Sequence, residues 1–359
     1  MEDKKELGLE QITNCAMCAD MCKHSCPTYL ATGRETSSPQ KLARLIVYEE
    51  KGFLEDRQGF FDVVFQSAMC GACKAHCIYG NHDLRDYIHR ARSKAFREGM
   101  LPEEMRKRVE TFMMFGNPNG ERPLVEKGTG AVGYFVSCSA YSDEQVPRAM
   151  DRIISASKEQ VQQFGGADIC CGAPLYYAGD VEGFAKAAEK MKGEFEKRGL
   201  RRVIADCPNC VKMMTQAYRT VGVDIDVEFI HTTQFLQALL GEGKMRVSKA
   251  DVSATYHDPC ILVNDLGIST APREILGALG FVVREPVYSR GDTHCCGALP
   301  GARIGDADVT HKVNLMRLNE LKETAAEMYV SACPTCKAVL SGVDTRDITE
   351  VVAERIVDG

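Results

Sequence analysis

The chain has 359 residues, which is long enough for two or three domains with a substantial core. Lys and Arg number 44 against 50 Asp and Glu, so the net charge is −6, and no basic stretch indicates nucleic-acid binding. No apolar run is long enough to span a membrane, and no apolar segment follows the charged amino terminus. We therefore expect a cytoplasmic protein, which a partner subunit could hold at a membrane surface.

The informative feature is the content of 17 cysteines. Disulfides explain an odd number poorly in a large chain without a secretion signal. Thiolates are soft ligands for iron and zinc, so metal binding is the better interpretation.

Residues 1–120 are predicted to be helical, because segments 39–50 and 84–98 carry apolar residues at helical spacing. The first cysteines of this region follow the bacterial ferredoxin spacing C-x2-C-x2-C-x3-C-P, with one extra residue after the second cysteine. In such runs three thiolates hold one cubane cluster, and the fourth, before proline, reaches the other cluster. This run comprises Cys15, Cys18, Cys22 and Cys26, followed by Pro27.

A second run, Cys70, Cys73 and Cys77, has Ser67 in place of its first cysteine and lacks the final proline. Cross-ligation then predicts two sites. A complete [4Fe–4S] site would be formed by Cys15, Cys18, Cys22 and Cys77. A three-thiolate site would be formed by Cys26, Cys70 and Cys73. It would hold either [3Fe–4S], or [4Fe–4S] with Ser67, water or another group on the fourth iron. Two zinc sites are the alternative, but seven cysteines divide awkwardly between them.

Beyond the glycine-rich segments 116–120 and 128–130, the sequence becomes α/β in character. Segments 131–137, 202–205, 252–256 and 328–331 are predicted as short buried strands, and each leads into a cysteine. Helical segments are expected at 211–219 and 337–340. The thiols would therefore lie at the carboxyl ends of strands and the amino ends of helices, where cofactors gather and thiolates are favoured.

One cysteine pattern occurs twice in this part of the chain. The first copy consists of Cys138, Cys170, Cys171, Cys207 and Cys210; the second consists of Cys260, Cys295, Cys296, Cys333 and Cys336. Cys138 and Cys260 are 122 residues apart, and Cys207 and Cys333 are 126 apart, which indicates an internal duplication or two facing half-domains. Five thiols exceed what a tetrahedral zinc or a cubane cluster needs, and adjacent cysteines can serve neighbouring metals of a cluster.

The doubled pattern resembles the cysteine-rich CCG domain. That domain occurs in heterodisulfide reductases and in iron–sulfur subunits of glycolate, lactate and glycerol-3-phosphate oxidation complexes. The flanking residues also match: His257-Asp258-Pro259 before Cys260, Gly172-Ala173-Pro174 after Cys171, and Pro334-Thr335 between Cys333 and Cys336. With a ferredoxin-like segment in front, the chain resembles the D subunit of heterodisulfide reductase. The resemblance implies an α plus α/β fold. A helical ferredoxin-like domain (1–120) would precede two Rossmann-like α/β CCG half-domains (121–245 and 246–359).

The resemblance also implies an activity. Each five-cysteine set would bind a noncubane [4Fe–4S] cluster, and the two clusters would flank a disulfide substrate and each take one sulfur, with the ten cysteines as catalytic ligands. The amino-terminal clusters would supply electrons from a cytochrome b, a flavoprotein or a ferredoxin. Because all 17 thiols are assigned to metal, none is left for thiol–disulfide exchange.

Two other functions stay open. The chain could be an electron-transfer subunit between a flavoprotein dehydrogenase and a membrane carrier, or a structural component of a larger redox complex. His257 and His294 lie near the second cysteine set, where each could donate a proton or a hydrogen bond, or could be an ordinary packed imidazole.

Overall fold

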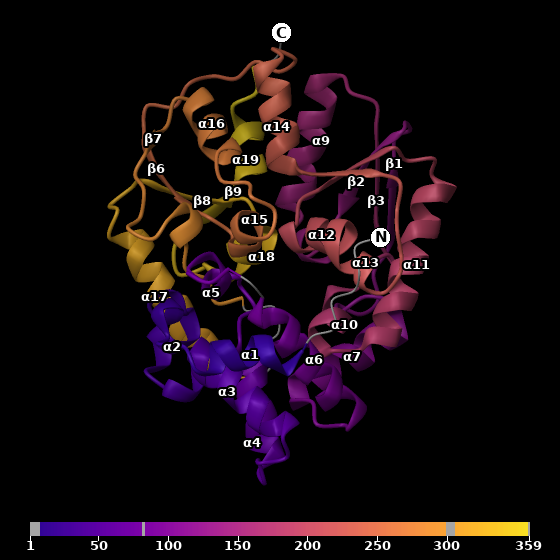
Figure 1. The fold of residues 1–359 in the computed structure, drawn as a ribbon. Coiled ribbons are helices and arrows are strands. Elements are labelled where there is room, and N and C mark those ends of the chain that lie inside the picture. The colour runs from indigo at the N-terminus through magenta and orange to yellow at the C-terminus, as the bar shows by residue number, and fades with distance from the viewer. Residues whose placement is uncertain (1–7, 81–82, 299–305, 358–359) are drawn as a thin grey trace.

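The computed structural model describes residues 8–80, 83–298 and 306–357. Figure 1 shows two α/β lobes side by side, with the amino-terminal helices in indigo beneath both of them. The mixture of a helical part with parallel sheets confirms the predicted α plus α/β class. Within the described ranges, no helix is both long and apolar enough to cross a membrane.

The amino-terminal part is helical, as predicted. Its α-helices are α1 (Leu9–Ala16), α2 (Pro27–Thr32), α3 (Pro39–Glu50), α4 (Arg57–Gln66), α5 (Ala72–Ala75), α6 (Leu84–Arg97) and α7 (Glu103–Phe115). Local sequence explains the start of α3, because the Ser38 side chain accepts a hydrogen bond from the backbone of Lys41 and Pro39 occupies the first turn.

The first lobe contains a five-stranded sheet in the order β1-β3-β2-β4-β5, in which only β1 runs antiparallel. Its strands are β1 (Leu124–Lys127), β2 (Val132–Val136), β3 (Val161–Gly166), β4 (Arg202–Ala205) and β5 (Glu228–His231). Its helices are α8 (Cys138–Tyr141), α9 (Gln145–Ser157), α10 (Ala173–Ala178), α11 (Val181–Lys197), α12 (Pro208–Lys212), α13 (Tyr218–Thr220) and α14 (Thr232–Gly241).

The second lobe has a parallel four-stranded sheet in the order β7-β6-β8-β9. Its strands are β6 (Ser253–His257), β7 (Val282–Val283), β8 (Met328–Ser331) and β9 (Thr345–Asp347). Its helices are α15 (Cys260–Asn264), α16 (Ala271–Ala278), α17 (Ala307–Lys322), α18 (Pro334–Val339) and α19 (Ile348–Glu354). This order repeats that of β3-β2-β4-β5, so the duplication predicted from the cysteine spacing is present in the topology.

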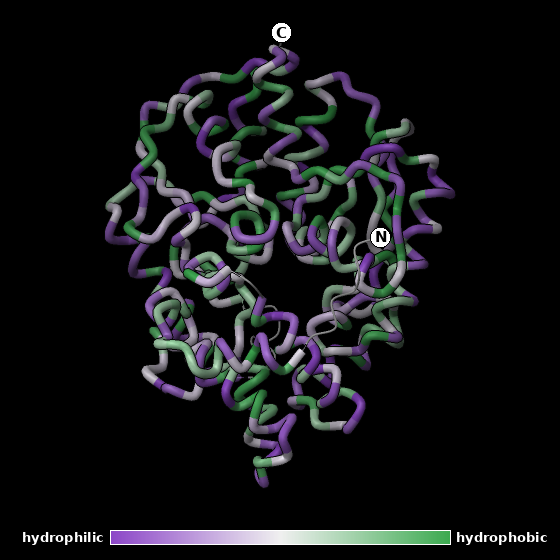
Figure 2. Tube along the Cα trace, viewed as in Figure 1, coloured by the Kyte–Doolittle hydropathy of each residue, from purple (hydrophilic) through white to green (hydrophobic). Residues whose placement is uncertain are grey.

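The two lobes share one hydrophobic core. Helix α9 packs on α19, and α14 packs on α16. Ile153 and Leu236 of the first lobe belong to the same buried cluster as Leu276 and Val352 of the second. Figure 2 shows hydrophobic segments in green within both lobes and along the helices between them. The mutual orientation of the lobes is therefore fixed by burial of apolar surface.

The amino-terminal domain is attached to both lobes. Phe65 and Ile88 share a core with Leu175 and Phe184 of the first lobe, while the Cys70 loop packs against the second. Gly179, after α10, has φ of 86°, and a Cβ there would lie 2.4 Å from the backbone of α6. Only glycine permits so close an approach of the two backbones.

Two details differ from the sequence predictions. Helices α12 and α18 begin at Pro208 and Pro334, inside the C-P-x-C motifs, whereas we expected them to begin after the second cysteine. Proline fits the first turn of a helix. The backbone N–H that proline lacks would have no hydrogen-bond partner within the helix at that position. Cys210 and Cys336 therefore lie within their helices and not before them.

Candidate cluster sites

A cavity of about 570 Å³ lies between the two lobes. The parallel strands end at its wall, which is where open α/β sheets place ligands. Lys107, Arg108 and Thr111 of α7 line it from the amino-terminal domain. Nine of the ten repeated cysteines line it: Cys138, Cys171, Cys207, Cys210, Cys260, Cys295, Cys296, Cys333 and Cys336.

The ten thiols form one continuous series of neighbours. In the first lobe the order is Cys138, Cys170, Cys171, Cys210 and Cys207, and the sulfurs of Cys171 and Cys210 are 3.4 Å apart. In the second lobe it is Cys260, Cys295, Cys296, Cys336 and Cys333. Cys207 contacts Cys333 and so joins the two halves. Each predicted five-cysteine set is thus gathered in one place, and the two sets adjoin.

The chemistry of this cavity fits soft, positively charged metals. All 17 cysteines are free thiols. Hydrogen bonds with neighbouring thiols, together with burial, raise the pKa of Cys210, Cys260 and Cys336 well above the ordinary value. Cys171 and Cys333 differ from these. Hydrogen bonds with Cys170 and Cys210 lower the pKa of Cys171 to about 6, and hydrogen bonds with Cys207 and Cys336 lower the pKa of Cys333 well below its ordinary value. Ten thiols packed this closely can ionise together only if cations compensate their charge, which iron in a cluster would do.

The amino-terminal cysteines line two cavities, and Cys73 lines both of them. The first, of about 340 Å³, is lined by Cys15, Cys18, Cys22, Cys73 and Cys77. Burial, chiefly, raises the pKa of Cys15 and Cys22 to about 12, so these thiols also need a cation in order to ionise.

A smaller cavity of about 40 Å³ is lined by Cys26, Cys70, Cys73 and Ser67. The Ser67 hydroxyl, at the vacant ligand position, accepts a hydrogen bond from the Met69 backbone at 3.3 Å. The assignment of individual cysteines to clusters stays a prediction, because Cys73 lines both cavities.

The three-cysteine group faces the second lobe. Cys70 shares a buried cluster with Cys260 and Cys295, and its charge interacts with that of Cys295. The side chain of Asn264 donates a hydrogen bond to the Cys70 carbonyl at 2.9 Å. The thiol groups therefore follow one another from the amino-terminal domain to the second lobe and then, through Cys333, to the first.

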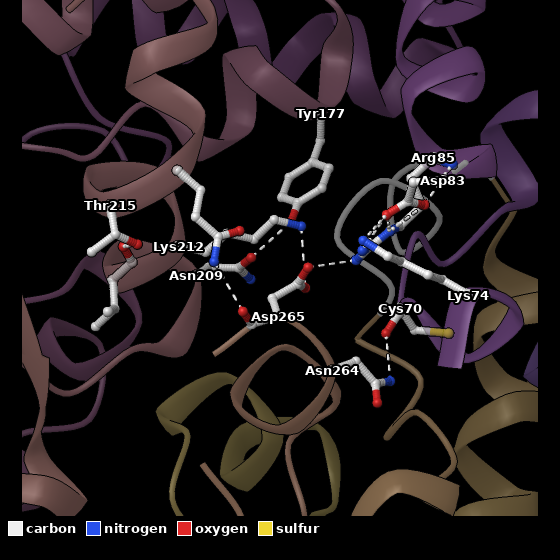
Figure 3. A network of polar contacts seen from close by, with 12 residues as sticks. Cys70, Lys74, Asp83, Arg85, Tyr177, Asn209, Lys212, Thr215, Asn264 and Asp265 are labelled. Atoms are coloured by element: carbon white, nitrogen blue, oxygen red, sulfur yellow. Dashed lines mark hydrogen bonds and ion pairs between the residues drawn. The ribbon is translucent and has the colours of Figure 1, made fainter. Parts of the chain in front are cut away.

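A network of buried charges holds the three parts of the chain together beside these groups (Figure 3). Asp265, at the end of α15, accepts from Arg85 of α6 at 2.7 Å and from Lys212 of α12 at 3.2 Å. Arg85 also binds both oxygens of Asp83. Burial by itself would raise the pKa of Asp83, but Arg85 lowers it to about 2. No sequence motif indicated this network, because Arg85 and Asp265 are 180 positions apart.

Two histidines flank the second cysteine set, and both are nearly fully buried. The Nδ1 of His257 accepts a hydrogen bond from Arg317 Nε at 3.0 Å. The Nδ1 of His294 lies 2.7 Å from Glu320, which also binds Arg317. The arginine and the glutamate both belong to α17, so one helix orients both imidazoles.

Two family models match the parts of the chain that carry these cysteines. A model described as "Cysteine-rich domain" matches residues 132–215 and 254–341, and one described as "4Fe-4S dicluster domain" matches residues 11–99. The D subunit of dihydromethanophenazine:CoB–CoM heterodisulfide reductase from Methanosarcina barkeri is 27% identical, over 97% of this chain and 95% of that protein. The corresponding protein from Methanosarcina acetivorans is 24% identical over the same shares.

The chain is a homologue of the D subunit of heterodisulfide reductase. It belongs with iron–sulfur electron-transfer subunits of oxidoreductases. Relatives of this chain are named as subunits of larger complexes. This D-subunit homologue is also 24% identical to the EtfAB:quinone oxidoreductase of Syntrophomonas wolfei, over 84% of this chain but 46% of that protein. A crystal structure of a hypothetical protein from Helicobacter pylori superposes with a TM-score of 0.57 at 8% identity, covering 88% of this chain and 68% of that one, which shows a shared fold alone.

Proposed function

We propose that this protein reduces a disulfide in the cavity between the lobes, using two noncubane [4Fe–4S] clusters. The ligands would be Cys138, Cys170, Cys171, Cys207 and Cys210 for the first cluster, and Cys260, Cys295, Cys296, Cys333 and Cys336 for the second. Disulfide reduction breaks one S–S bond, consumes two electrons and two protons, and yields two thiols. Bound clusters would supply the electrons one at a time and offer iron to the substrate sulfurs.

The observation that carries the proposal is the contact between Cys207 and Cys333. It brings the two five-thiol sets together, and nine of the ten cysteines line one cavity, so both sulfurs of a single disulfide can meet a thiol-bound metal at once. A cavity of about 570 Å³ is also within the usual range of roughly 300–1,000 Å³ for small-molecule sites, although the clusters themselves would take up part of it.

The order of the thiol groups supports a route for electron entry. A partner subunit would reduce a [4Fe–4S] cluster held by Cys15, Cys18, Cys22 and Cys77. The electron would pass to the group of Cys26, Cys70 and Cys73, holding [4Fe–4S] or [3Fe–4S], and then to the second lobe beside Cys295. The network around Asp265 would keep the Cys70 loop in place for that step.

The similarity to EtfAB:quinone oxidoreductase supports a second candidate. In this alternative the chain would carry electrons between a flavoprotein dehydrogenase and a membrane carrier, with no disulfide bound. The complete ligand set in both lobes favours the first candidate, because conduction does not need two adjoining sites open to one cavity.

An anaerobic EPR experiment separates the two candidates. The protein is purified without oxygen, oxidised, and mixed in turn with the CoB–CoM heterodisulfide, glutathione disulfide or their thiols. A new paramagnetic signal that depends on the added thiol or disulfide, and that is lost in Cys207→Ser, supports disulfide chemistry. Absence of any such signal, together with rapid electron exchange with a reduced flavoprotein, would reject it.

Other predictions fit this proposal. We also propose that the chain divides into residues 1–120, 121–245 and 246–359, the last two being Rossmann-like half-domains. The repeated strand order supports this proposal. Attachment to a membrane would rely on a partner such as a cytochrome b.

A further inference from the structure

The surroundings of the two cysteine sets differ at equivalent positions. His257 and Phe135 both lie three residues before the first cysteine of their sets. The strand register gives the same equivalence, since His257 pairs with Ser331 and Phe135 with Ala205, each two residues before a C-P-x-C motif. The duplicated fold therefore places an imidazole in the second lobe where the first has an apolar ring.

The same contrast occurs before the paired cysteines. His294 precedes Cys295, whereas Ile169 precedes Cys170. The two histidines and the two apolar residues are all buried, so solvent does not screen the difference in polarity between them. The second set thus has nitrogen donors in a low-dielectric setting where the first has hydrocarbon.

The hydrogen bonds of His257 fix its tautomer. Arg317 can only donate, so Nδ1 of His257 must carry a lone pair. In the neutral ring the proton is then on Nε2, and that nitrogen is buried with no hydrogen-bond partner among the described residues.

Two sulfurs of the second set lie close to the His257 ring. A ring nitrogen of His257 and the Sγ atoms of Cys296 and Cys336 all lie within 4.8 Å of one another. The same three residues could suggest a metal site with histidine as a ligand. That would require a lone pair on Nε2 while Nδ1 already accepts from Arg317, and hence a ring without either proton. The geometry favours donation over ligation.

We propose that His257 donates an Nε2–H···S hydrogen bond to the thiolate of Cys296 or Cys336, and that this hydrogen bond raises the reduction potential of the second cluster. Donors to cluster sulfurs stabilise the extra negative charge of the reduced state. Arg317 is the positioning residue, because it holds the ring and its tautomer. Electrons arriving from the Cys70 group would then first meet the cluster whose potential His257 raises. The first-lobe cluster would lie beyond it, across the Cys207–Cys333 contact.

This inference rests on the proposed cluster content, so the test begins with iron and sulfide analysis of the wild-type holoprotein. His257→Phe copies the first lobe and removes the donor. His257→Gln keeps both polar functions, since its amide can accept from Arg317 and donate to sulfur. His311→Phe, at an exposed position on the same helix as Arg317, is the matched control. Redox titration followed by EPR, and pulsed EPR on protein labelled with ¹⁵N-histidine, give readouts independent of turnover.

We expect one cluster of His257→Phe to titrate at a lower potential with full iron content, and its weak histidine ¹⁵N coupling to disappear. His257→Gln should recover most of the potential, and His311→Phe should match the wild type. An unchanged potential in His257→Phe with clusters intact would overturn the proposal, and so would a strong ¹⁵N coupling accompanied by loss of iron, which would make His257 a ligand. Wild-type protein without noncubane clusters would instead reject the proposed function itself.

Discussion

Replacing Asp265 with asparagine is expected to weaken the junction of the three parts of the chain. The substitution keeps the shape of the side chain and removes its charge. The Asp265 side chain is 4% exposed, and those of Arg85 and Lys212 are each 8% exposed, so solvent screens these charges little. Arg85 keeps Asp83 as a partner, whereas Lys212 loses its carboxylate.

The expected loss of stability follows from the charge on Lys212 that is left without a partner. Leaving one charge of a buried pair without its partner costs about 3–5 kcal/mol. Because Arg85 stays compensated, we expect the lower end, about 3 kcal/mol. A loss of one kcal/mol in the free energy of unfolding lowers the thermal unfolding midpoint by roughly 2–4 °C in a unit of 150–250 residues. The midpoint of the two lobes should therefore fall by about 6–12 °C.

Thermal unfolding of the anaerobic holoprotein, followed by circular dichroism at one fixed scan rate, measures this shift. Glu182→Gln, in an exposed pair with Lys186, is the control and should leave the midpoint unchanged. Adding Lys212→Met to Asp265→Asn removes the uncompensated charge and should restore much of the loss. If the double variant melts no higher than Asp265→Asn, the buried ion pair is not the cause and the reasoning is wrong.

Three further predictions concern separate parts of the molecule. Ser67→Cys should supply a fourth thiolate to the small amino-terminal site, so iron analysis should rise and any [3Fe–4S] EPR signal of the oxidised wild type should vanish; an unchanged spectrum and iron content would contradict the ligand assignment. Burial raises the pKa of Asp347 to about 7, above its unfolded value near 4, so its contribution to stability is present at low pH and lost as pH rises through 7. Asp347→Asn, which keeps the helix cap, should therefore gain a few kcal/mol relative to wild type between pH 4 and 8 in urea titrations, and a pH-independent difference would refute the shift. Gly179→Ala should lower stability by about 3 kcal/mol through positive φ and a backbone clash with Ser93, whereas Gly193→Ala, in open space on α11, should be neutral or slightly stabilising in the same assay.

Much of the site was predictable, because its signals are local. Within each C-P-x-C motif and each ferredoxin-type run the cysteines lie within a few residues of one another, and the repetition of one five-cysteine pattern predicted which of the other thiols gather. Strands β2, β4, β6 and β8 were anticipated because each is a short buried run leading into a cysteine. Strand β7 has two residues and strand β9 has three, and segments this short show no recognisable alternation of polar and apolar residues.

Helix starts were less predictable within the motifs. We expected the C-P-x-C cysteines to precede their helices, but proline at the first turn draws the second cysteine inside. The signal was available in the sequence, since proline favours the first turn of a helix.

The amino-acid sequence was enough to identify a cysteine-rich redox protein with a duplicated five-thiol pattern, because ligand type and short-range spacing are properties of the chain. The relation between the duplicates emerges from the folded molecule. The shared core of the lobes brings Cys207 to Cys333, and the charges around Asp265 set the Cys70 loop against the second lobe. These contacts join residues more than a hundred positions apart, and they depend on which surfaces are buried together, which spacing along the chain does not encode.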